Sequence, residues 1–381
     1  MSQPCQDNFS TTFSSLTAMM KYHEEQVKNS NWERIEVNRL QVAPLDQSSP
    51  LFSDTSAFAD CVSGDAIKDT ASNLGLALKL DGKYYPVRNT AYKGLLDRAK
   101  LGGTSLPKLK RKELAGMINS CLRLYPNAQA LMLIRNEKIS AAHSGDEHDY
   151  SILSMDELMS ALTDHLDREY PGSVFEAGYS DHAFTNATWL LNGKRDELLD
   201  TYEKTLKAQG KGSLVSKLTP GIQFSSSDTG HASAKVSAML LGGQHPIHIG
   251  GILAIEHRRQ KTVAHFEKEL AQLFAQFGDS IARLEKLTRI HLDYPGNTMT
   301  RICKKLALPK KASLEAIAMF DMALGGTPAT AHDVYMAMQE ILFILKTDGT
   351  PQGKLILLAE NMARALTLRW SEYDLAKAVS W

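Results

Sequence analysis

The spacing of the apolar residues changes near residue 260, and this change constrains the fold more than any other feature of the chain. In the segment 234–240, apolar and polar residues alternate, which is the period of a half-buried strand. Over 263–287, apolar residues recur every three or four positions, which is typical of one face of a helix. The chain therefore combines strands in its middle with helices in its C-terminal third.

The apolar stripe after this change predicts one long helix from 260 to 291. At a rise of about 1.5 Å per residue, about 30 residues would extend for roughly 45 Å. Pro295 ends the pattern, and further helical patterns follow it. The segment 259–381 is therefore predicted to be all-helical.

The strand patterns in the middle of the chain come in pairs that are joined by turn residues. Asp81 and Gly82 together are a strong signal for a hairpin turn. The same arrangement is expected around Asn136 and at Asp228 to Gly230. Antiparallel pairing of neighbouring strands follows from these short connections.

The predicted fold class is α+β, with a hairpin-built antiparallel sheet and flanking helices in the middle, followed by an all-helical C-terminal part. We expect three segments. Residues 1–64 hold an N-terminal helix at 9–28, a strand and a loop, residues 65–258 form the α+β core domain, and residues 259–381 form the helical C-terminal domain. A capping-box pattern at Ser154 opens one of the flanking helices.

Composition limits the class of protein. The 381 residues include 43 Lys and Arg against 43 Asp and Glu, so a strongly basic nucleic-acid coat and an acidic tail are excluded. The four cysteines are far apart and form no C-x-x-C pair, which predicts a reducing compartment. No basic region precedes an apolar run at the N-terminus, and no apolar run is long enough to cross a bilayer. We expect a cytoplasmic protein without a membrane segment.

The motifs of the common enzyme classes are missing from the sequence. It contains no phosphate loop, no dinucleotide-binding glycine pattern, no H-E-x-x-H and no G-x-S-x-G. The sequence therefore leans against an enzyme, and no cofactor is expected. A dispersed metal site would use His143, His148, His245 and His248, although solvated loop histidines are the simpler interpretation.

Three basic clusters are candidates for contacts with phosphate groups. They are Lys108, Lys110, Arg111 and Lys112, then Arg258, Arg259 and Lys261, and a third cluster between Arg301 and Lys311. Tyr84, Tyr85 and Tyr92 precede the first cluster and are candidates for stacking on unpaired bases. Each cluster alone is more simply a solvated charged face, and convergence on one groove is needed to make a nucleic-acid site.

The run from Ser225 to Gly230 is rich in hydroxyl groups. The backbone amides of such a turn can hold a phosphate. A serine-rich hairpin tip without a ligand is the simpler interpretation, because such turns are common.

Short segments spread over about residues 35 to 345 carry a resemblance to a known family. They are Gly82 to Tyr92, Leu131 to Ser144, Tyr150 to Glu157, Pro220 to Gly230, Ser233 to Ser237, His257 to Arg259 and Thr330 to Ala337. In these segments the chain resembles the phage/plasmid-like family of mobile-element proteins, which carry a domain of unknown function. That family has Arg-x-x-Cys and then Asn-Gly where this chain has Leu240 to His248, so no role tied to that cysteine is expected here.

The resemblance implies an origin in a phage, a plasmid or an integrative element, among DNA-processing genes, and it supplies no catalytic residue. Our first hypothesis is a non-catalytic DNA-transaction protein, similar in outline to single-strand annealing proteins. It would bind single-stranded or displaced DNA through a basic groove and would assemble as a homo-oligomer.

Two alternatives belong to other classes. One is a metal-dependent enzyme that acts on nucleic acid or on a phosphorylated small molecule. The other is a structural or anti-defence protein that docks to a host protein through the long helix at 260–291.

Overall fold

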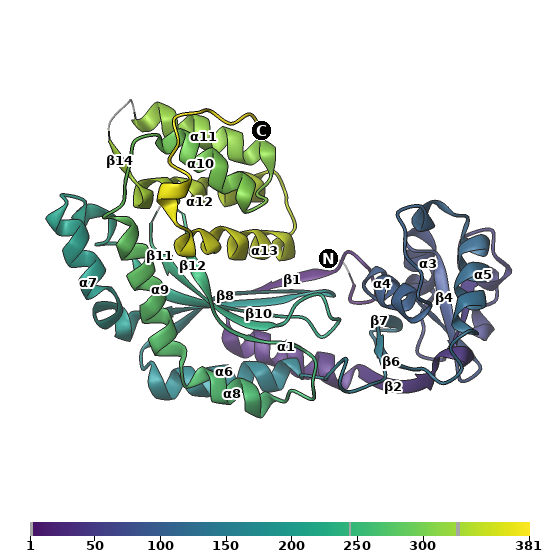
Figure 1. Ribbon diagram of the computed structural model, residues 1–381. Helices are drawn as coiled ribbons and strands as arrows, with labels where there is room; N and C mark the ends of the chain where they lie inside the picture. The colour runs from purple at the N-terminus through teal and green to yellow at the C-terminus, as the bar shows by residue number, and fades with distance from the viewer. Residues whose placement is uncertain (1–2, 244, 325–327) are drawn as a thin grey trace.

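The chain folds as an α+β protein around a six-stranded antiparallel sheet with the strand order β1-β8-β9-β10-β11-β12 (Figure 1). The computed structural model describes residues 3–243, 245–324 and 328–381. The strands are β1 (Ser10–Phe13), β8 (Ser173–Asp181), β9 (Thr185–Leu191), β10 (Thr219–Ser226), β11 (Ala234–Leu241) and β12 (Ile247–Ile255). The first part of the helix expected at 9–28 is therefore the edge strand β1, and the helix α1 (Leu16–Lys28) follows it.

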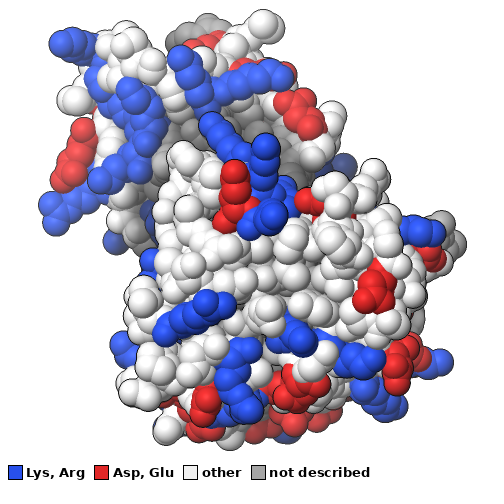
Figure 2. All heavy atoms as spheres, turned by 90° about the vertical axis from the view of Figure 1, so that its right-hand side faces the viewer, with Lys and Arg blue, Asp and Glu red and all other residues white. Residues whose placement is uncertain are grey.

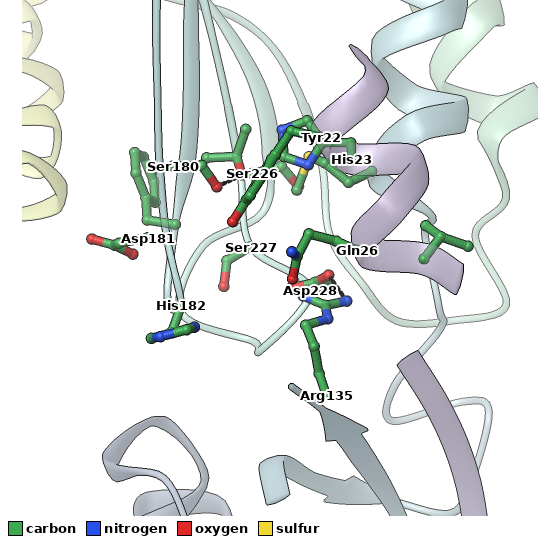
Figure 3. Close-up of a pocket in the computed structure, with 14 residues that line it drawn as sticks. Tyr22, His23, Gln26, Arg135, Ser180, Asp181, His182, Ser226, Ser227 and Asp228 are labelled. Carbon is green, nitrogen blue, oxygen red and sulfur yellow. Dashed lines mark hydrogen bonds and ion pairs between the residues drawn. The ribbon is translucent and has the colours of Figure 1, made fainter. Parts of the chain in front are cut away.

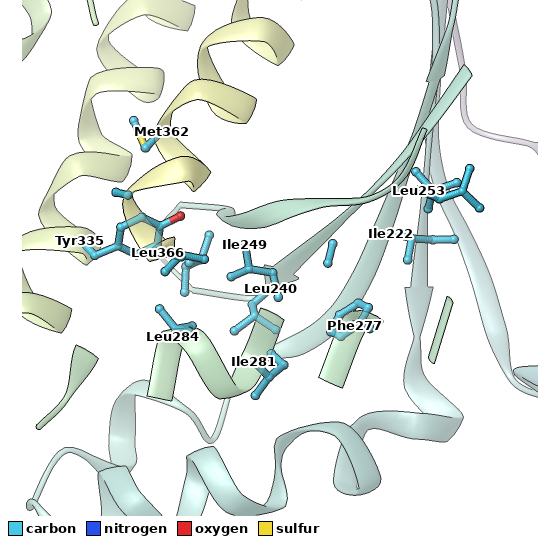
Figure 4. Close-up of a cluster of buried hydrophobic side chains, with 14 of the residues drawn as sticks. Ile222, Leu240, Ile249, Leu253, Phe277, Ile281, Leu284, Tyr335, Met362 and Leu366 are labelled. Carbon is cyan, nitrogen blue, oxygen red and sulfur yellow. The ribbon is translucent and has the colours of Figure 1, made fainter. Parts of the chain in front are cut away.

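One face of this sheet is apolar and is covered by helices. Trp189, Ile222 and Phe224 alternate with polar residues along β9 and β10, and all three are buried. The helices packed on this face are α1, α6 (Met155–Glu169), α7 (Arg195–Ala208), α8 (Val263–Leu270) and α9 (Leu273–Leu287). Figure 4 shows part of this core, where Phe277 and Ile281 of α9 lie below the strands.

The single helix predicted at 260–291 is wrong, because α8 and α9 are separate helices. They keep the predicted apolar stripe, and Phe266 and Phe277 are fully buried. The chain changes direction at Ala271 and Gln272 because α8 packs on α6, whereas α9 packs on α7 and β12 (Figure 1). The apolar stripe faces the sheet, and docking of a host protein to this segment stays a prediction.

Among its described residues, the C-terminal region from α8 onward is helical apart from two short strands. It continues with α10 (Pro295–Lys305), α11 (Lys310–Leu324), α12 (Ala331–Thr347) and α13 (Gln352–Ala363). The strands β13 (His291–Leu292) and β14 (Ala329–Thr330) pair with each other, so the prediction of an all-helical part needs this correction. Thr330 and Asp333 form a reciprocal capping box that starts α12.

A second lobe is built from residues between β2 and β7. It holds two three-stranded antiparallel sheets, β2-β6-β7 and β3-β4-β5. Its elements are β2 (Ser30–Glu36), β3 (Gln41–Pro44), α2 (Pro50–Ser53), α3 (Gly64–Ser72), β4 (Leu76–Leu80), β5 (Lys83–Pro86), α4 (Asn89–Arg98), α5 (Arg111–Leu122), β6 (Gln129–Arg135) and β7 (Lys138–Ser144). Figure 1 shows this lobe beside the free end of the main sheet.

The predicted hairpins are confirmed, but the predicted capping box before α6 is not formed. β4 and β5 turn at Asp81 and Gly82, both with positive φ, as a type I′ turn requires. β6 and β7 turn at Asn136 and Glu137 in the same way. Before α6, the Ser154 hydroxyl donates to Asp156 rather than capping the helix.

The buried apolar side chains form separate clusters in the two parts of the molecule. One cluster joins Met19 to residues 153–370, and another joins residues 37–142. The division into 1–64, 65–258 and 259–381 stays a prediction. In the described part of the chain, no helix has the length and apolar character needed to span a membrane.

Candidate binding groove

The three predicted basic clusters lie in different parts of the molecule. Lys108 and Lys110 precede α5 in the lobe, and Arg111 and Lys112 begin it. Arg258, Arg259 and Lys261 lie in the turn between β12 and α8, and the third cluster lies on α10 and α11. In Figure 1, α5 lies in the lobe, α8 lies below the main sheet and α10 lies above it. The clusters therefore do not converge on one groove.

Several of these cations are already engaged by the protein. The guanidinium group of Arg258 pairs with Glu256 beside it, with a nitrogen to oxygen distance of 2.7 Å. Arg301 and Lys304 donate to the main-chain carbonyls of Lys377 and Ser380. The last residues of the chain thus lie along α10 and occupy part of the third cluster.

The three candidate stacking tyrosines are half-buried in the lobe. The Tyr84 ring packs on Phe58 with a centroid distance of 6.3 Å, and the Lys79 ammonium group lies over the Tyr84 ring. Burial raises the pKa of both Tyr85 and Tyr92. These rings contribute to the packing of the lobe and do not form a shared exposed surface on which bases could stack.

The four candidate metal-binding histidines do not form one site, since His245 and His248 lie at the start of β12 whereas His143 belongs to β7 of the lobe. His143 stacks on Tyr150 with a centroid distance of 3.5 Å, and His148 lies in an exposed turn. His245 contacts Glu340 at 2.7 Å between the ring nitrogen and the carboxylate oxygen. Among the residues that the structure describes, no group of three or more His, Cys, Asp or Glu side chains is placed to hold a metal ion.

The serine-rich turn is buried where the lobe meets the main sheet, so it is not an exposed hairpin tip. Ser226, Ser227 and Thr229 are each at most 5% exposed, and the hydroxyl groups of Ser227 and Thr229 lie 3.0 Å apart. Arg135 of the lobe donates to the Asp228 carboxylate at 2.5 Å, as Figure 3 shows. The Tyr150 hydroxyl donates to the Asp228 carbonyl at 2.6 Å.

The ionisation states of the groups at this junction favour a structural role for the serine-rich turn. Burial lowers the pKa of His23 and of His143 to about 4, so both rings are neutral at pH 7. Burial alone would raise the pKa of Asp228, but the Arg135 guanidinium outweighs it and holds that pKa below its usual value. The cavity between these groups has a volume of only about 20 Å³, which suits one water molecule.

A much larger groove lies on the other face of the main sheet, and we call it the sheet–helix groove. Its volume is about 620 Å³, within the range of ligand-binding sites. Strands β8 to β11 form its floor, and α12 and α13 form one wall. His245 and Pro246 also line it.

The floor of the sheet–helix groove is polar because of the strand register. Gln223 of β10 lies opposite Thr188 of β9 and Ser237 of β11, and Asn186 lies opposite Ser225. Residues that pair across antiparallel strands share a face, so these side chains form two polar rows on the side away from the apolar core.

Asn186 is the most unusual group in this floor. Its side chain is 5% exposed, and its Oδ1 accepts a hydrogen bond from Gln223 Nε2 at 3.5 Å. Its Nδ2 is buried and has no hydrogen-bond partner. Leaving such a donor unpaired costs about 1 to 3 kcal/mol, so the groove offers a polar ligand a favourable contact.

Aromatic and apolar side chains line the rest of the groove. Tyr179 of β8 lies toward the β1 edge, and Phe343 of α12 lies on the opposite wall. Phe343 is 47% exposed, and its ring packs against His245 with a centroid distance of 4.4 Å. A flat ligand can therefore meet aromatic faces above a floor of amides and hydroxyls.

The charges of the sheet–helix groove are few. Lys346 at the end of α12 and Glu176 of β8 line it, and His248 is uncharged at pH 7 because burial lowers its pKa to about 4.

Figure 2 shows the side of the molecule at the right of Figure 1. Lys and Arg dominate its upper part, at the height of the C-terminal helices, whereas its centre is mostly uncharged.

Sequence reasoning missed the groove residues, although a signal was present. In β9 and β10, Asn186, Thr188 and Gln223 alternate with buried apolar residues. The central strands of a sheet that is covered on both faces are apolar throughout, so polar alternation indicates one open face. Phe343 gave no comparable signal, because one apolar residue in a helix is usually part of a core.

Comparison with known proteins gives no match of any kind. No family model, no curated protein and no solved structure matches this chain.

Proposed function

We propose that this protein binds single-stranded nucleic acid, without catalysis, in the sheet–helix groove. The observation that carries the proposal is the unpaired Nδ2 of Asn186 in a polar sheet floor that also bears the rings of Tyr179 and Phe343 on its borders. The wider role that we propose is the one implied by the resemblance, a DNA transaction of a phage or plasmid, with assembly as a homo-oligomer.

The chemistry of unpaired bases fits both surfaces of the groove. Bases present hydrogen-bond donors and acceptors on their edges, which amides such as Asn186 and Gln223 can meet. Their π-faces stack on aromatic rings, and each stacked base contributes about 1 to 3 kcal/mol. Bases within a duplex are paired and stacked, so they cannot enter the groove in this way.

The site of binding differs from the one expected from the sequence. The basic clusters at 108–112 and 258–261 lie on other parts of the surface, so we assign the principal phosphate contact to Lys346. A groove with so few cations predicts weak dependence on salt, because each neutralised phosphate contributes separately to counterion release.

Fluorescence anisotropy with a labelled single-stranded oligonucleotide tests this proposal. The wild type should bind at low salt and should prefer the single strand to a duplex of the same sequence. Phe343→Ala should weaken binding at least fivefold because a stacking contact is lost. Lys346→Glu should weaken binding and reduce the dependence on salt by about one phosphate.

Two control variants match these changes elsewhere on the surface. Met322→Ala removes an apolar side chain that is 84% exposed on α11, and it should leave the affinity unchanged. Lys112→Glu changes the cluster favoured by the sequence and should have little effect. The proposal is wrong if the wild type does not bind at low salt, or if Phe343→Ala binds as tightly as the wild type.

A further inference from the structure

A second pocket lies toward the C-terminal end of α13 and shares no lining residue with the sheet–helix groove. It has a volume of about 460 Å³ and lies between β12, α9, α13 and the 3-10 turn η6 (Arg364–Thr367). Ile249 of β12 and Leu366 of η6 form an apolar part of its lining, and Figure 4 shows them facing each other. The volume is sufficient for a ligand of the size of a nucleotide.

Two arginine side chains from different elements line this pocket. Arg283 belongs to α9 and Arg364 to η6, and both are exposed. Within the described residues, neither guanidinium group makes a hydrogen bond or an ion pair. By contrast, Lys235 in the same pocket pairs with Glu360 at 2.7 Å.

The hydroxyl groups and the side-chain amide of the pocket already have partners. The Ser280 hydroxyl donates to the Gln276 carbonyl at 3.1 Å, and the Thr367 hydroxyl donates to the Arg364 carbonyl at 2.9 Å. The amide of Gln276 donates to Gln272. The two guanidinium groups are therefore the principal unused donors that face a ligand.

The charge of the pocket favours an anion. Lys235 and Glu360 neutralise each other, which leaves Arg283 and Arg364 against the single carboxylate of Glu269. An arginine guanidinium presents a planar fork of donors that matches the oxygens of a phosphate group.

We infer that this pocket binds a phosphate group through Arg283 and Arg364. The phosphate belongs either to a mononucleotide-sized ligand or to the backbone of a polynucleotide, since both offer the same oxygen acceptors. The site is separate from the sheet–helix groove, and it does not depend on the function proposed for that groove.

Isothermal titration calorimetry on the full chain at low salt tests the inference with three probes. They are inorganic phosphate, adenosine 5′-monophosphate and a single-stranded oligonucleotide, with adenosine as the uncharged control. At least one phosphate-bearing probe should bind, and adenosine should not bind. Arg283→Gln and Arg364→Gln should each weaken that binding about tenfold or more, because each removes a charge-assisted hydrogen bond.

Matched variants separate this site from the sheet–helix groove. Arg123→Gln changes an exposed arginine in the lobe and should leave the affinity unchanged. Phe343→Ala should not change the affinity for adenosine 5′-monophosphate or inorganic phosphate. If only the oligonucleotide binds, and the two glutamine variants weaken it, the phosphate comes from a polynucleotide.

Two results would overturn the inference. One is that none of the three phosphate-bearing probes binds the wild type. The other is that both glutamine variants bind every probe with wild-type affinity. The second result leaves the proposal for the sheet–helix groove untouched. Conversely, if inorganic phosphate or adenosine 5′-monophosphate binds and the oligonucleotide does not, only the proposal for the groove fails.

Discussion

Asp228 lies where the lobe meets the main sheet, and its environment makes it hard to replace. Its carboxylate pairs with Arg135 at 2.5 Å, and both side chains are less than one fifth exposed. Its main chain accepts the Tyr150 hydroxyl, and the Tyr150 ring lies between the rings of His143 and His257. One residue thus combines an ion pair, a hydrogen bond and contact with an aromatic stack.

Replacing Asp228 by Asn should destabilise the protein by about 3 to 5 kcal/mol, because Arg135 is left as a buried charge without a counterion. Urea denaturation followed by circular dichroism measures the change. The control is Glu147→Gln, which breaks the exposed ion pair with Arg34 and should cost at most about 1 kcal/mol. Similar losses in the two variants would contradict the structural role of Asp228.

At the scale of elements, close packing of helices on strands holds the lobe together. Helix α4 lies against β7 so closely that a Cβ added at Gly94 would lie 2.2 Å from the Ala142 carbonyl oxygen. Gly116 in α5 is also helical, but a Cβ added there meets nothing within 4 Å. Replacing these two glycines by alanine should therefore have opposite effects on stability.

Gly94→Ala should destabilise the protein by about 2 to 4 kcal/mol, because the backbone of α4 or β7 must move to admit the methyl group. Gly116→Ala should instead stabilise it by about 0.5 to 1 kcal/mol, since alanine favours the helix. Thermal unfolding of the two variants beside the wild type measures both effects. Equal melting temperatures for the two variants would show that α4 does not pack on β7 as described.

At the scale of the whole molecule, buried neutral histidines join distant parts of the chain. His332 of α12 bonds to the Tyr202 hydroxyl of α7 at 2.6 Å, and His182 contacts the Gln6 carbonyl at 2.7 Å. Burial lowers the pKa of His332 to about 4 and that of His182 to about 3. His23, His143 and His248 are lowered to about 4 in the same way.

These histidines predict a loss of stability in mild acid. In the unfolded chain they take up protons near pH 6.5, whereas in the folded protein they remain neutral until about pH 4. The free energy of unfolding should therefore fall as the pH falls from about 6.5 to 4, by up to about 1.4 kcal/mol per pH unit for each histidine. Urea denaturation at pH 7.5, 6.5 and 5.5 measures this slope.

Two histidine variants serve as the comparison for this pH dependence. His332→Gln should make the slope shallower, because one buried neutral ring is lost. His148→Gln should leave the slope unchanged, because that ring is exposed. The stabilisation by the Asp228 carboxylate is lost only at lower pH, because its pKa is below the usual value of an aspartate, so it does not change the slope between pH 7.5 and 5.5. Stability that is constant from pH 7.5 to 5.5 would be inconsistent with the buried histidines.

The sequence by itself determined the local elements of this protein. The hairpins at Asp81 and Asn136 and the change to helices near residue 260 all follow from the spacing of nearby residues. Such signals are local, because a turn or a helical face depends on residues only a few positions apart.

The tertiary structure decided everything that depends on residues far apart in the chain. It placed the basic clusters on separate surfaces and divided the predicted long helix into α8, which packs on α6, and α9, which packs on α7. It also gathered Asn186, Gln223 and Phe343 around one groove. No spacing in the sequence encodes these arrangements, because they arise when apolar faces of distant elements are buried together. The sheet–helix groove exists because the strand register directs the apolar side chains of β9 and β10 to one face and leaves their polar side chains on the other.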